Sequence, residues 1–335
     1  MGRLVQPIIL AEQVSKTFEQ RIRSAGFGAA IRDFVWPKTR PVHAVEDISF
    51  TIAPGEAVGY LGPNGAGKST MIKMLTGILV PSAGRVEVLG RNPSANRIAN
   101  AREFGVVFGQ RSQLWWDLPV RDSFDLHGRI YRVDPAGFRA RQDMLVEMLE
   151  IGEFLERPVR QLSLGQRMRA EMAMSLLHEP RVLFLDEPTI GLDVVAKDVV
   201  RRFLSDVNRT DGVTIILTTH DLKDIEEICP RLIMVDEGKL LFDGRTDKLN
   251  ASFGGRRRLS LQFEADPGEL YLNGAELVEA QGVMREFLVD DADRSLVEII
   301  GELGNRGQLR DARLEEPDIE EVIRTYFRGR RGSLR

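Results

Sequence analysis

The fold of this chain is decided by residues 56–79, which read EAVGYLGPNGAGKSTMIKMLTGIL. An apolar run leads into a glycine-rich turn, and a helical pattern follows it. The turn fits the spacing G-x-x-x-x-G-K-S/T and consists of Gly62, Pro63, Asn64, Gly65, Ala66, Gly67, Lys68, Ser69 and Thr70. Glycines let consecutive backbone N–H groups curve around an anion, and the helix presents its positive end to that anion. The motif therefore predicts a phosphate-binding loop, in which Lys68 reaches the β and γ phosphates of a nucleotide and Ser69 coordinates Mg²⁺.

A second apolar run, VLFLDEP at residues 182–188, ends in two adjacent carboxylates. A buried strand seldom ends in paired acids unless a cation compensates their charge. In a chain without a phosphate loop, such an acidic strand end would be interpreted as a simple turn. Here Asp186 is predicted to hold Mg²⁺ through its water shell, and Glu187 to polarise the attacking water as a general base.

Short apolar runs alternate with helical patterns over much of the chain. The runs are FGVVFG (104–109), TIILTTH (214–220) and RLIMVDEG (231–238), and helices are expected at 137–150 and 166–178. Such alternation predicts an α/β core with a largely parallel sheet. We expect a nucleotide-binding domain at residues 1–244, with an inserted helical subdomain at about residues 112–178.

Residues 162–166, Leu-Ser-Leu-Gly-Gln, resemble the signature motif of the ATP-binding cassette (ABC) ATPases. Leu164 stands where glycine is commoner, while Ser163, Gly165 and Gln166 keep the family pattern. The resemblance covers residues 8–244 and implies a P-loop NTPase fold with a RecA-like core that binds ATP and Mg²⁺. In that family the signature opens a helix and caps the γ-phosphate of ATP on the opposite subunit, which is anion binding at a helix N-terminus. A second copy of the chain is therefore expected to complete each site.

Other positions match the family in order and spacing. Gln110 matches the Q-loop glutamine, which contacts Mg²⁺ and the attacking water and links the site to the membrane partner; Gln113 is a weaker candidate. Asp193, in Gly191-Leu192-Asp193, matches the D-loop aspartate at the dimer contact. His220 matches the switch histidine that contacts the γ-phosphate.

Phe18 is the candidate for the aromatic side chain that stacks on adenine, with His43 or Trp36 as alternatives. Strands are predicted at residues 7–18 and 44–52, so a basic and aromatic insertion at about residues 19–42 separates them. Such a segment can lie on an anionic membrane surface or against a membrane partner. It can equally form a solvated hairpin extension, and the sequence leaves both interpretations open.

The chain changes character after Gly244, where the predicted strands become amphipathic. RRLSLQFE, AELVEAQG, VMREFLVDD and QLRDARLEE alternate polar and apolar residues, with a helix expected at 295–303 and a final helix from about Pro317. This pattern predicts an α+β domain at residues 245–335 whose sheet has one face in water. The domain is similar to the accessory domain that follows the cassette in exporter ATPases of the drug, lipid and polysaccharide type.

Composition limits the surroundings in which the chain works. Its 46 basic and 50 acidic residues leave a formal charge of −4, so no nucleic-acid partner is expected. The single cysteine, Cys229, cannot form an internal disulfide, which fits a reducing compartment. No secretory signal and no apolar stretch of about 20 residues is apparent. We expect a peripheral protein at the cytoplasmic face of the cell membrane.

The resemblance implies an ATPase that powers a permease encoded on another chain. The accessory domain implies export, although an importer would share every catalytic residue. Trp115 and Trp116 are candidates for docking the permease, and the alternative is that both pack inside the helical subdomain. One rival function is a soluble cassette ATPase acting on ribosomes or nucleic acid. Another is a regulatory module without catalysis, against which the intact Lys68 and Glu187 argue.

Overall fold

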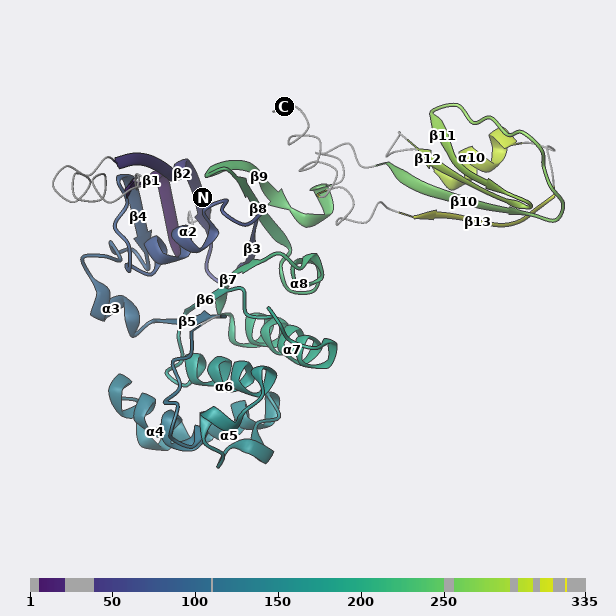
Figure 1. Cartoon of the computed structure of the whole chain (residues 1–335). Coiled ribbons are helices and arrows are strands. Elements are labelled where there is room, and N and C mark those ends of the chain that lie inside the picture. Colours follow the sequence, from purple (N-terminus) through teal and green to yellow (C-terminus); the bar gives the residue numbers. More distant parts are fainter. Residues whose placement is uncertain are drawn as a thin grey trace, which may run out of the picture. The chain divides into compact units, whose positions relative to one another are not determined.

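The computed structural model describes residues 6–21, 39–109, 111–249, 256–289, 295–303, 308–315 and 323 (Figure 1). Gln110, Trp36, most of the predicted insertion and nearly all of the predicted final helix lie outside these residues. The chain divides into two compact units, Met1–Thr246 and Asp247–Arg335. No helix in the described part is long and apolar enough to span a bilayer.

The first unit is built on a six-stranded sheet with the order β5-β6-β7-β3-β8-β9. All neighbours pair in parallel except β9, which pairs antiparallel with β8. The strands are β3 (Ala57–Leu61), β5 (Phe104–Phe108), β6 (Val182–Asp186), β7 (Thr214–Thr219), β8 (Arg231–Asp236) and β9 (Lys239–Arg245). The predicted α/β core with a largely parallel sheet is therefore confirmed. Parallel pairing brings the carboxyl ends of β3, β5, β6 and β7 to one edge, where ligands bind in such sheets.

A smaller antiparallel sheet, ordered β2-β1-β4, lies beside it. Its strands are β1 (Ile9–Arg21), β2 (Thr39–Ile52) and β4 (Ala83–Val88). Helix α2 (Lys68–Leu75) packs between the two sheets, because Met71, Ile72 and Leu75 share one buried core with residues of both. On the opposite face of β3, Gly59 leaves room for Ile225 of helix α8 (Leu222–Ile228), since a Cβ on Gly59 would lie 2.3 Å from the Cδ1 atom of Ile225.

The ends predicted for the first two strands were wrong where the strands face the insertion, whereas the predicted end of the second strand at Ile52 is confirmed. β1 continues past Phe18 to Arg21, and β2 begins at Thr39 rather than Ala44, with Glu19 opposite Pro41 and Arg21 opposite Thr39. The ladder continues because main-chain hydrogen bonds pair the strands whatever their side chains are, whereas the prediction followed the apolar alternation, which stops earlier. The two interpretations of the intervening segment concern residues mainly outside the described ones.

Helices fill the remainder of the first unit, and α4, α5 and α6 pack against one another (Figure 1). They are α3 (Arg97–Ala101), α4 (Val120–Tyr131), α5 (Pro135–Met148), α6 (Leu164–Leu176), α7 (Val194–Asp211) and α8 (Leu222–Ile228), with 3₁₀ turns at Gly152–Phe154 and Val159–Gln161. Local sequence sets their ends. Asp134 accepts a hydrogen bond from Gly137 N at the start of α5, where Pro135 fits the first turn, and Gly212 in a left-handed conformation ends α7.

The second unit is a four-stranded antiparallel sheet with the order β11-β12-β10-β13. It comprises β10 (Arg257–Phe263), β11 (Ala275–Gln281), β12 (Met284–Val289), β13 (Leu309–Glu315) and helix α10 (Leu296–Leu303), preceded by a 3₁₀ turn at Thr246–Lys248. Alternate residues of β10 and β12, among them Leu259, Leu261 and Phe287, form a core with Ile299 of α10. The unit therefore has a hydrophobic core of its own, and its α+β architecture agrees with the sequence pattern.

Candidate active site

The phosphate loop joins the end of β3 to the first turn of α2, and its glycines are required either by a positive φ angle or by a close backbone approach. Gly65 and Gly67 have positive φ angles of 89° and 98°. A Cβ on Gly67 would lie 2.1 Å from the carbonyl oxygen of Ala44, and one on Gly62 would lie 2.3 Å from that of Val235. The loop is thus confined between β2 and β8, with the N-terminus of α2 at its end.

Lys68 folds back over this loop. Its Nζ donates to the carbonyl oxygens of Gly62, at 2.7 Å, and Pro63, at 3.2 Å, and lies 3.9 Å from Oε1 of Glu187. Burial lowers the pKa of Lys68, while the negative charges of Glu187 and Asp186 oppose that shift. A buried ammonium group beside a loop of backbone N–H groups gains most when an anion such as a polyphosphate supplies further negative charge.

Asp186 links the phosphate loop to β6 and β7. Its Oδ1 accepts a hydrogen bond of 3.0 Å from the Ser69 hydroxyl and one of 2.7 Å from the Thr218 hydroxyl. Of the three predicted Mg²⁺ contacts, Ser69 and Asp186 are 117 positions apart in the sequence and lie within hydrogen-bonding distance, while Gln110 lies outside the described residues. A hydroxyl and a carboxylate are hard oxygen ligands, and Mg²⁺ in phosphate sites uses one or two protein side chains besides phosphates and water, so the donor set fits that ion.

Glu187 has a left-handed backbone conformation, with φ of 54°. Its N–H donates to both the carbonyl oxygen and the hydroxyl of Thr218, at 3.0 and 3.1 Å. Its Oε1 lies 3.7 Å from Nδ1 of His220, the residue that follows β7. Lys68, Glu187 and His220, which the sequence places in three separate segments, thus converge at the carboxyl edge of the sheet.

Ser163 caps the N-terminus of α6. Its hydroxyl accepts from Gln166 N at 3.2 Å, and the Gln166 side chain accepts from Ser163 N at 3.0 Å, which together form a capping box. Leu164 packs near the D-loop, since a Cβ on Gly191 would lie 2.9 Å from its side chain. Asp193 caps α7 by accepting from Ala196 N at 2.8 Å. The signature and D-loop segments are therefore neighbours within one chain.

Three residues bear on the predicted adenine contact. Phe18 is 38% exposed, with the Lys16 ammonium 5.3 Å from its ring centre. His43 is on the neighbouring strand and makes a 3.1 Å hydrogen bond with the Thr17 hydroxyl. Because β2 meets the phosphate loop at Ala44, His43 lies one residue from that contact. Both Phe18 and His43 remain candidates, and Trp36 lies outside the described residues.

Two buried acidic groups near the site escaped the sequence analysis. Asp224 is fully buried and accepts from Arg201 at 2.6 Å and from the Thr189 and Thr219 hydroxyls at 2.6 and 2.8 Å. Asp224 therefore holds together the segment after β6, through Thr189, and the end of β7, through Thr219.

Glu171 of α6 is 3% exposed and is hydrogen-bonded to the segment after Gln110. A polar residue at an inward-facing helix position is the sequence signal that could have identified either one.

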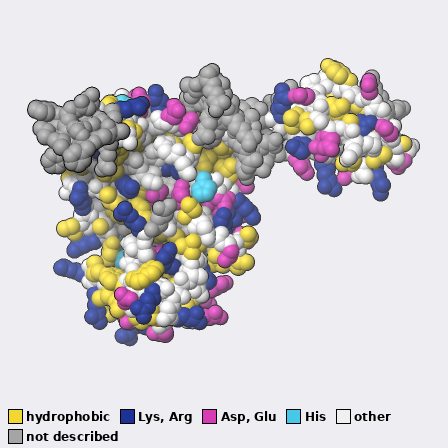
Figure 2. All heavy atoms as spheres, viewed as in Figure 1, with side chains coloured by type: hydrophobic (Ala, Val, Ile, Leu, Met, Phe, Trp, Pro, Cys, Tyr) yellow, Lys and Arg dark blue, Asp and Glu magenta, His cyan; other side chains and the backbone are white. Residues whose placement is uncertain are grey.

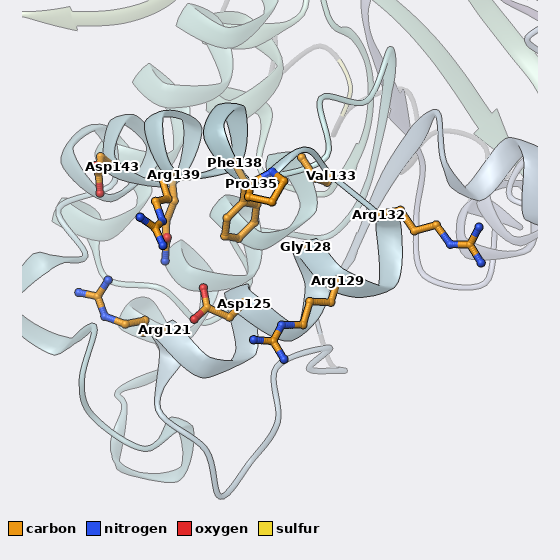
Figure 3. Close-up of a pocket in the computed structure, with 11 residues that line it drawn as sticks. Arg121, Asp125, Gly128, Arg129, Arg132, Val133, Pro135, Phe138, Arg139 and Asp143 are labelled. Carbon is orange, nitrogen blue, oxygen red and sulfur yellow. The ribbon is translucent and has the colours of Figure 1, made fainter.

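A hollow of about 540 Å³ lies between α4 and α5 in the helical subdomain, and none of the candidate site residues lines it (Figure 3). Phe138 packs on Gly128, where a Cβ would lie 2.6 Å from the ring. Arg121 and Arg139 reach the hollow from opposite helices. On the face shown in Figure 2, basic and hydrophobic side chains are mixed over the α4 and α5 region.

Trp115 and Trp116 are 37% and 52% exposed, so they do not both pack inside the helical subdomain. Their backbones are fixed, because Trp115 N donates to the Ser123 hydroxyl at 3.2 Å and Trp116 O accepts from Arg160 N at 3.0 Å. The Arg167 guanidinium lies 5.9 Å from the Trp116 ring centre. The segment thus presents two large aromatic side chains on a rigid backbone.

The chain is similar in sequence and in fold to ATP-binding proteins of ABC transporters. The family model described as ABC transporter matches residues 45–190. The daunorubicin resistance ATP-binding protein DrrA3 of Streptomyces coeruleorubidus is 34% identical over 290 residues, 84% of this chain and 90% of that protein. The Nod factor export ATP-binding protein I of Paraburkholderia xenovorans (strain LB400) is 38% identical over 246 residues, 73% of this chain and 79% of that protein. Among solved structures, the dimeric ATP-binding cassette MJ0796 bound to ADP and Pi matches with a TM-score of 0.59 and 24% identity, over 71% of this chain and 98% of that chain, which shows the same fold.

Proposed function

The chain belongs to the ATP-binding proteins of ABC transporters, and from this premise we propose that it works as a cassette dimer that drives export through separately encoded permease subunits. The observation that carries the proposal is the convergence of Lys68, Asp186 and Glu187 beside the phosphate loop. That arrangement suits ATP hydrolysis, which needs positioning and charge stabilisation rather than covalent catalysis.

The loop N–H groups and Lys68 bind the β and γ phosphates of ATP. Ser69 and Asp186 hold Mg²⁺, which when bound neutralises charge on those phosphates. Glu187 accepts the proton of the attacking water, and its 3.7 Å approach to His220 supports a shared role of the two side chains at the γ-phosphate. Gln110 of the Q-loop is assigned to the same water and ion by family pattern alone.

Ser163 and Gly165 serve the ATP bound by the opposite copy. The Ser163 oxygen is already an acceptor for Gln166 N, so its own proton is available for a phosphate oxygen. The positive end of α6 favours the same anion. Asp193 lies at the contact between copies, and the dimeric state of the similar MJ0796 cassette supports this arrangement.

Export is supported by the relatives, which are named for daunorubicin resistance and Nod factor export. Neither name refers to ribosomes or nucleic acid. With this role the chain would be a peripheral protein at the cytoplasmic face of the membrane. The exposed Trp115 and Trp116, beside the Q-loop, supply the aromatic anchors that a stable docking surface uses.

The test is affinity purification of the chain from detergent-solubilised membranes of its own cells. A polytopic membrane protein should co-purify in stoichiometric amount. Replacing both Trp115 and Trp116 with alanine should abolish that association and leave nucleotide binding intact, whereas Ile130→Ala, another exposed apolar side chain, should leave both intact. Recovery of ribosomes, nucleic acid or no partner would refute the transport role but not the ATPase.

A further inference from the structure

Glu171 lies in the middle of α6, the helix that begins with the signature, yet its carboxyl group serves another segment. Oε1 accepts from the Ser112 hydroxyl, from Gln113 N at 2.8 Å and from Leu114 N at 3.4 Å. These three donors belong to the stretch between Gln110 and Trp115. One oxygen atom of α6 therefore fixes the chain immediately after the Q-loop glutamine.

Burial of the Glu171 carboxyl group costs free energy that packing of the side chain alone would not offset. Glu171 is 3% exposed, burial raises its pKa, and its Oε2 has no hydrogen-bond partner among the described residues. An apolar side chain at this position would avoid the desolvation cost. Only a hydrogen-bond acceptor at this position can pair with the N–H groups of Gln113 and Leu114 and the Ser112 hydroxyl at once. These bonds order residues 112–114.

A second contact joins the same two elements. Arg167, one helical turn before Glu171, places its guanidinium 5.9 Å from the Trp116 ring centre. Ser163 lies two turns before Glu171, roughly 12 Å along the helix axis at the usual rise per residue. The residue expected to contact ATP on the opposite copy and the residue that holds the Q-loop segment are therefore on one rigid element.

We propose that Glu171 is a positioning residue that joins the signature helix to residues 112–116, so that binding of ATP at Ser163 displaces Trp115 and Trp116 together with α6. This inference rests on the proposed function, because it gives that function a route from nucleotide to permease. Glu171 contacts neither phosphate nor water in this scheme. It acts through the segment that it holds.

The test compares three variants of the full chain. Glu171→Leu removes the acceptor, and Glu171→Gln keeps one acceptor oxygen in nearly the same shape. Ser175→Ala is the matched control, because within the described part of the chain this buried hydroxyl of α6 bonds only to Met172 of its own helix. All are made in a Trp36→Phe background, which keeps an aromatic ring at this candidate for adenine stacking and whose ATP affinity is first compared with that of the natural sequence, so that tryptophan emission reports on Trp115 and Trp116 alone.

We expect ATP to change the tryptophan emission of the parent, Glu171→Gln and Ser175→Ala proteins. Glu171→Leu should lose this change, although its affinity for a fluorescent ATP analogue should equal that of the parent. Acrylamide should quench the tryptophans more strongly in Glu171→Leu alone. Urea unfolding identifies any variant that is simply less stable. An ATP response retained in Glu171→Leu, or lost equally in Glu171→Gln, would overturn the proposal. These readouts need no permease, so their failure is distinct from failure of the transport role.

Discussion

Glu187 shows how a single backbone conformation prepares the site. A left-handed conformation at a residue other than glycine costs about 1 kcal/mol or more, and here two hydrogen bonds from Glu187 N to Thr218 hold it. The conformation turns the carboxylate toward Lys68 and His220 instead of continuing β6. Strain at this position fits a group that must meet a reacting water.

Replacing Glu187 with glutamine should preserve ATP binding and lower turnover by roughly 10²- to 10⁴-fold, the usual contribution of a general base. The amide keeps the size of the side chain but cannot accept the proton of water. Turnover is measured by phosphate release, and accumulation of a closed dimer with ATP by size-exclusion chromatography. Glu153→Gln, at an exposed position, should hydrolyse ATP normally. Unchanged hydrolysis in Glu187→Gln would remove this residue as the base.

The buried His127 and the half-buried His178 form a neutral pair. His178 Nε2 lies 3.1 Å from the carbonyl oxygen of Phe104, which can only accept, so His178 Nδ1 accepts from His127 Nε2 at 3.2 Å. The Tyr131 ring stacks on His127, with the ring centres 4.2 Å apart, and lies tilted against His178, with the ring centres 4.1 Å apart. Burial lowers the pKa of His127 to about 3 and that of His178 to about 4, from an ordinary 6.5.

Because the unfolded chain binds these protons first, the stability that the pair provides is complete above pH 6.5 and decreases as the pH falls toward 4. At pH 5.5 the loss should be roughly 1 kcal/mol per histidine. Urea unfolding at pH 7.5 and 5.5 measures it. His127→Gln should flatten the dependence, whereas His43→Gln, at an exposed position, should not. Equal slopes for the two variants would contradict the assignment.

At the scale of elements, α6 combines several tasks in one helix. Its first turn carries the signature residues, its middle carries Glu171, and its C-terminus is followed by His178, which bonds to Phe104 of the edge strand β5. A helix transmits displacement along its axis because its hydrogen bonds are internal. The helical subdomain therefore has a rigid connection between nucleotide and surface.

Ser163→Ala should lower the free energy of unfolding by about 1 kcal/mol, the usual value of an N-cap, and should also reduce ATP hydrolysis. Asp134→Ala removes the cap of α5 instead, so it should lose similar stability and hydrolyse ATP normally. Urea unfolding and phosphate release are measured on both proteins. Equal hydrolysis by the two variants would show that Ser163 acts only as a cap.

At the scale of the molecule, every candidate nucleotide contact lies in the first unit, and the second unit has its own core around Leu259, Phe287 and Ile299. Each unit thus has a buried hydrophobic core made of its own residues. We interpret residues 1–244 as the cassette and the remainder as an accessory domain. On this interpretation the nucleotide site is complete without the accessory domain, which the next experiment tests.

A chain shortened to residues 1–249, which keeps the fully buried Leu249, should bind a fluorescent ATP analogue with unchanged affinity. Lys68→Ala in the full chain should lose that affinity, because the ammonium group on the loop is removed. Circular dichroism checks that the shortened chain is folded. Loss of binding in a folded shortened chain would mean that the second unit contributes to the nucleotide site.

The sequence by itself determined the features that are local. The phosphate loop was predictable because glycines with positive φ and a following helix encode their own conformation, as at Gly65 and Gly67. The parallel core followed from apolar strands alternating with helices, and the second unit followed from alternation with period two. The family resemblance placed the signature at a helix start, and in the structure Ser163 caps α6 by a hydrogen bond within its own turn.

The tertiary structure alone decided which distant residues meet. Ser69 and Asp186 share a hydrogen bond only because α2 begins, and β6 ends, at the same edge of the sheet. The length of the β1–β2 hairpin depended on main-chain pairing that side-chain patterns do not encode. Glu171 reads in the sequence as one polar residue in a helix, and its role appears only when residues 112–114 fold against it. Contacts across long stretches of chain are set by packing of whole elements, so no local pattern could have specified them.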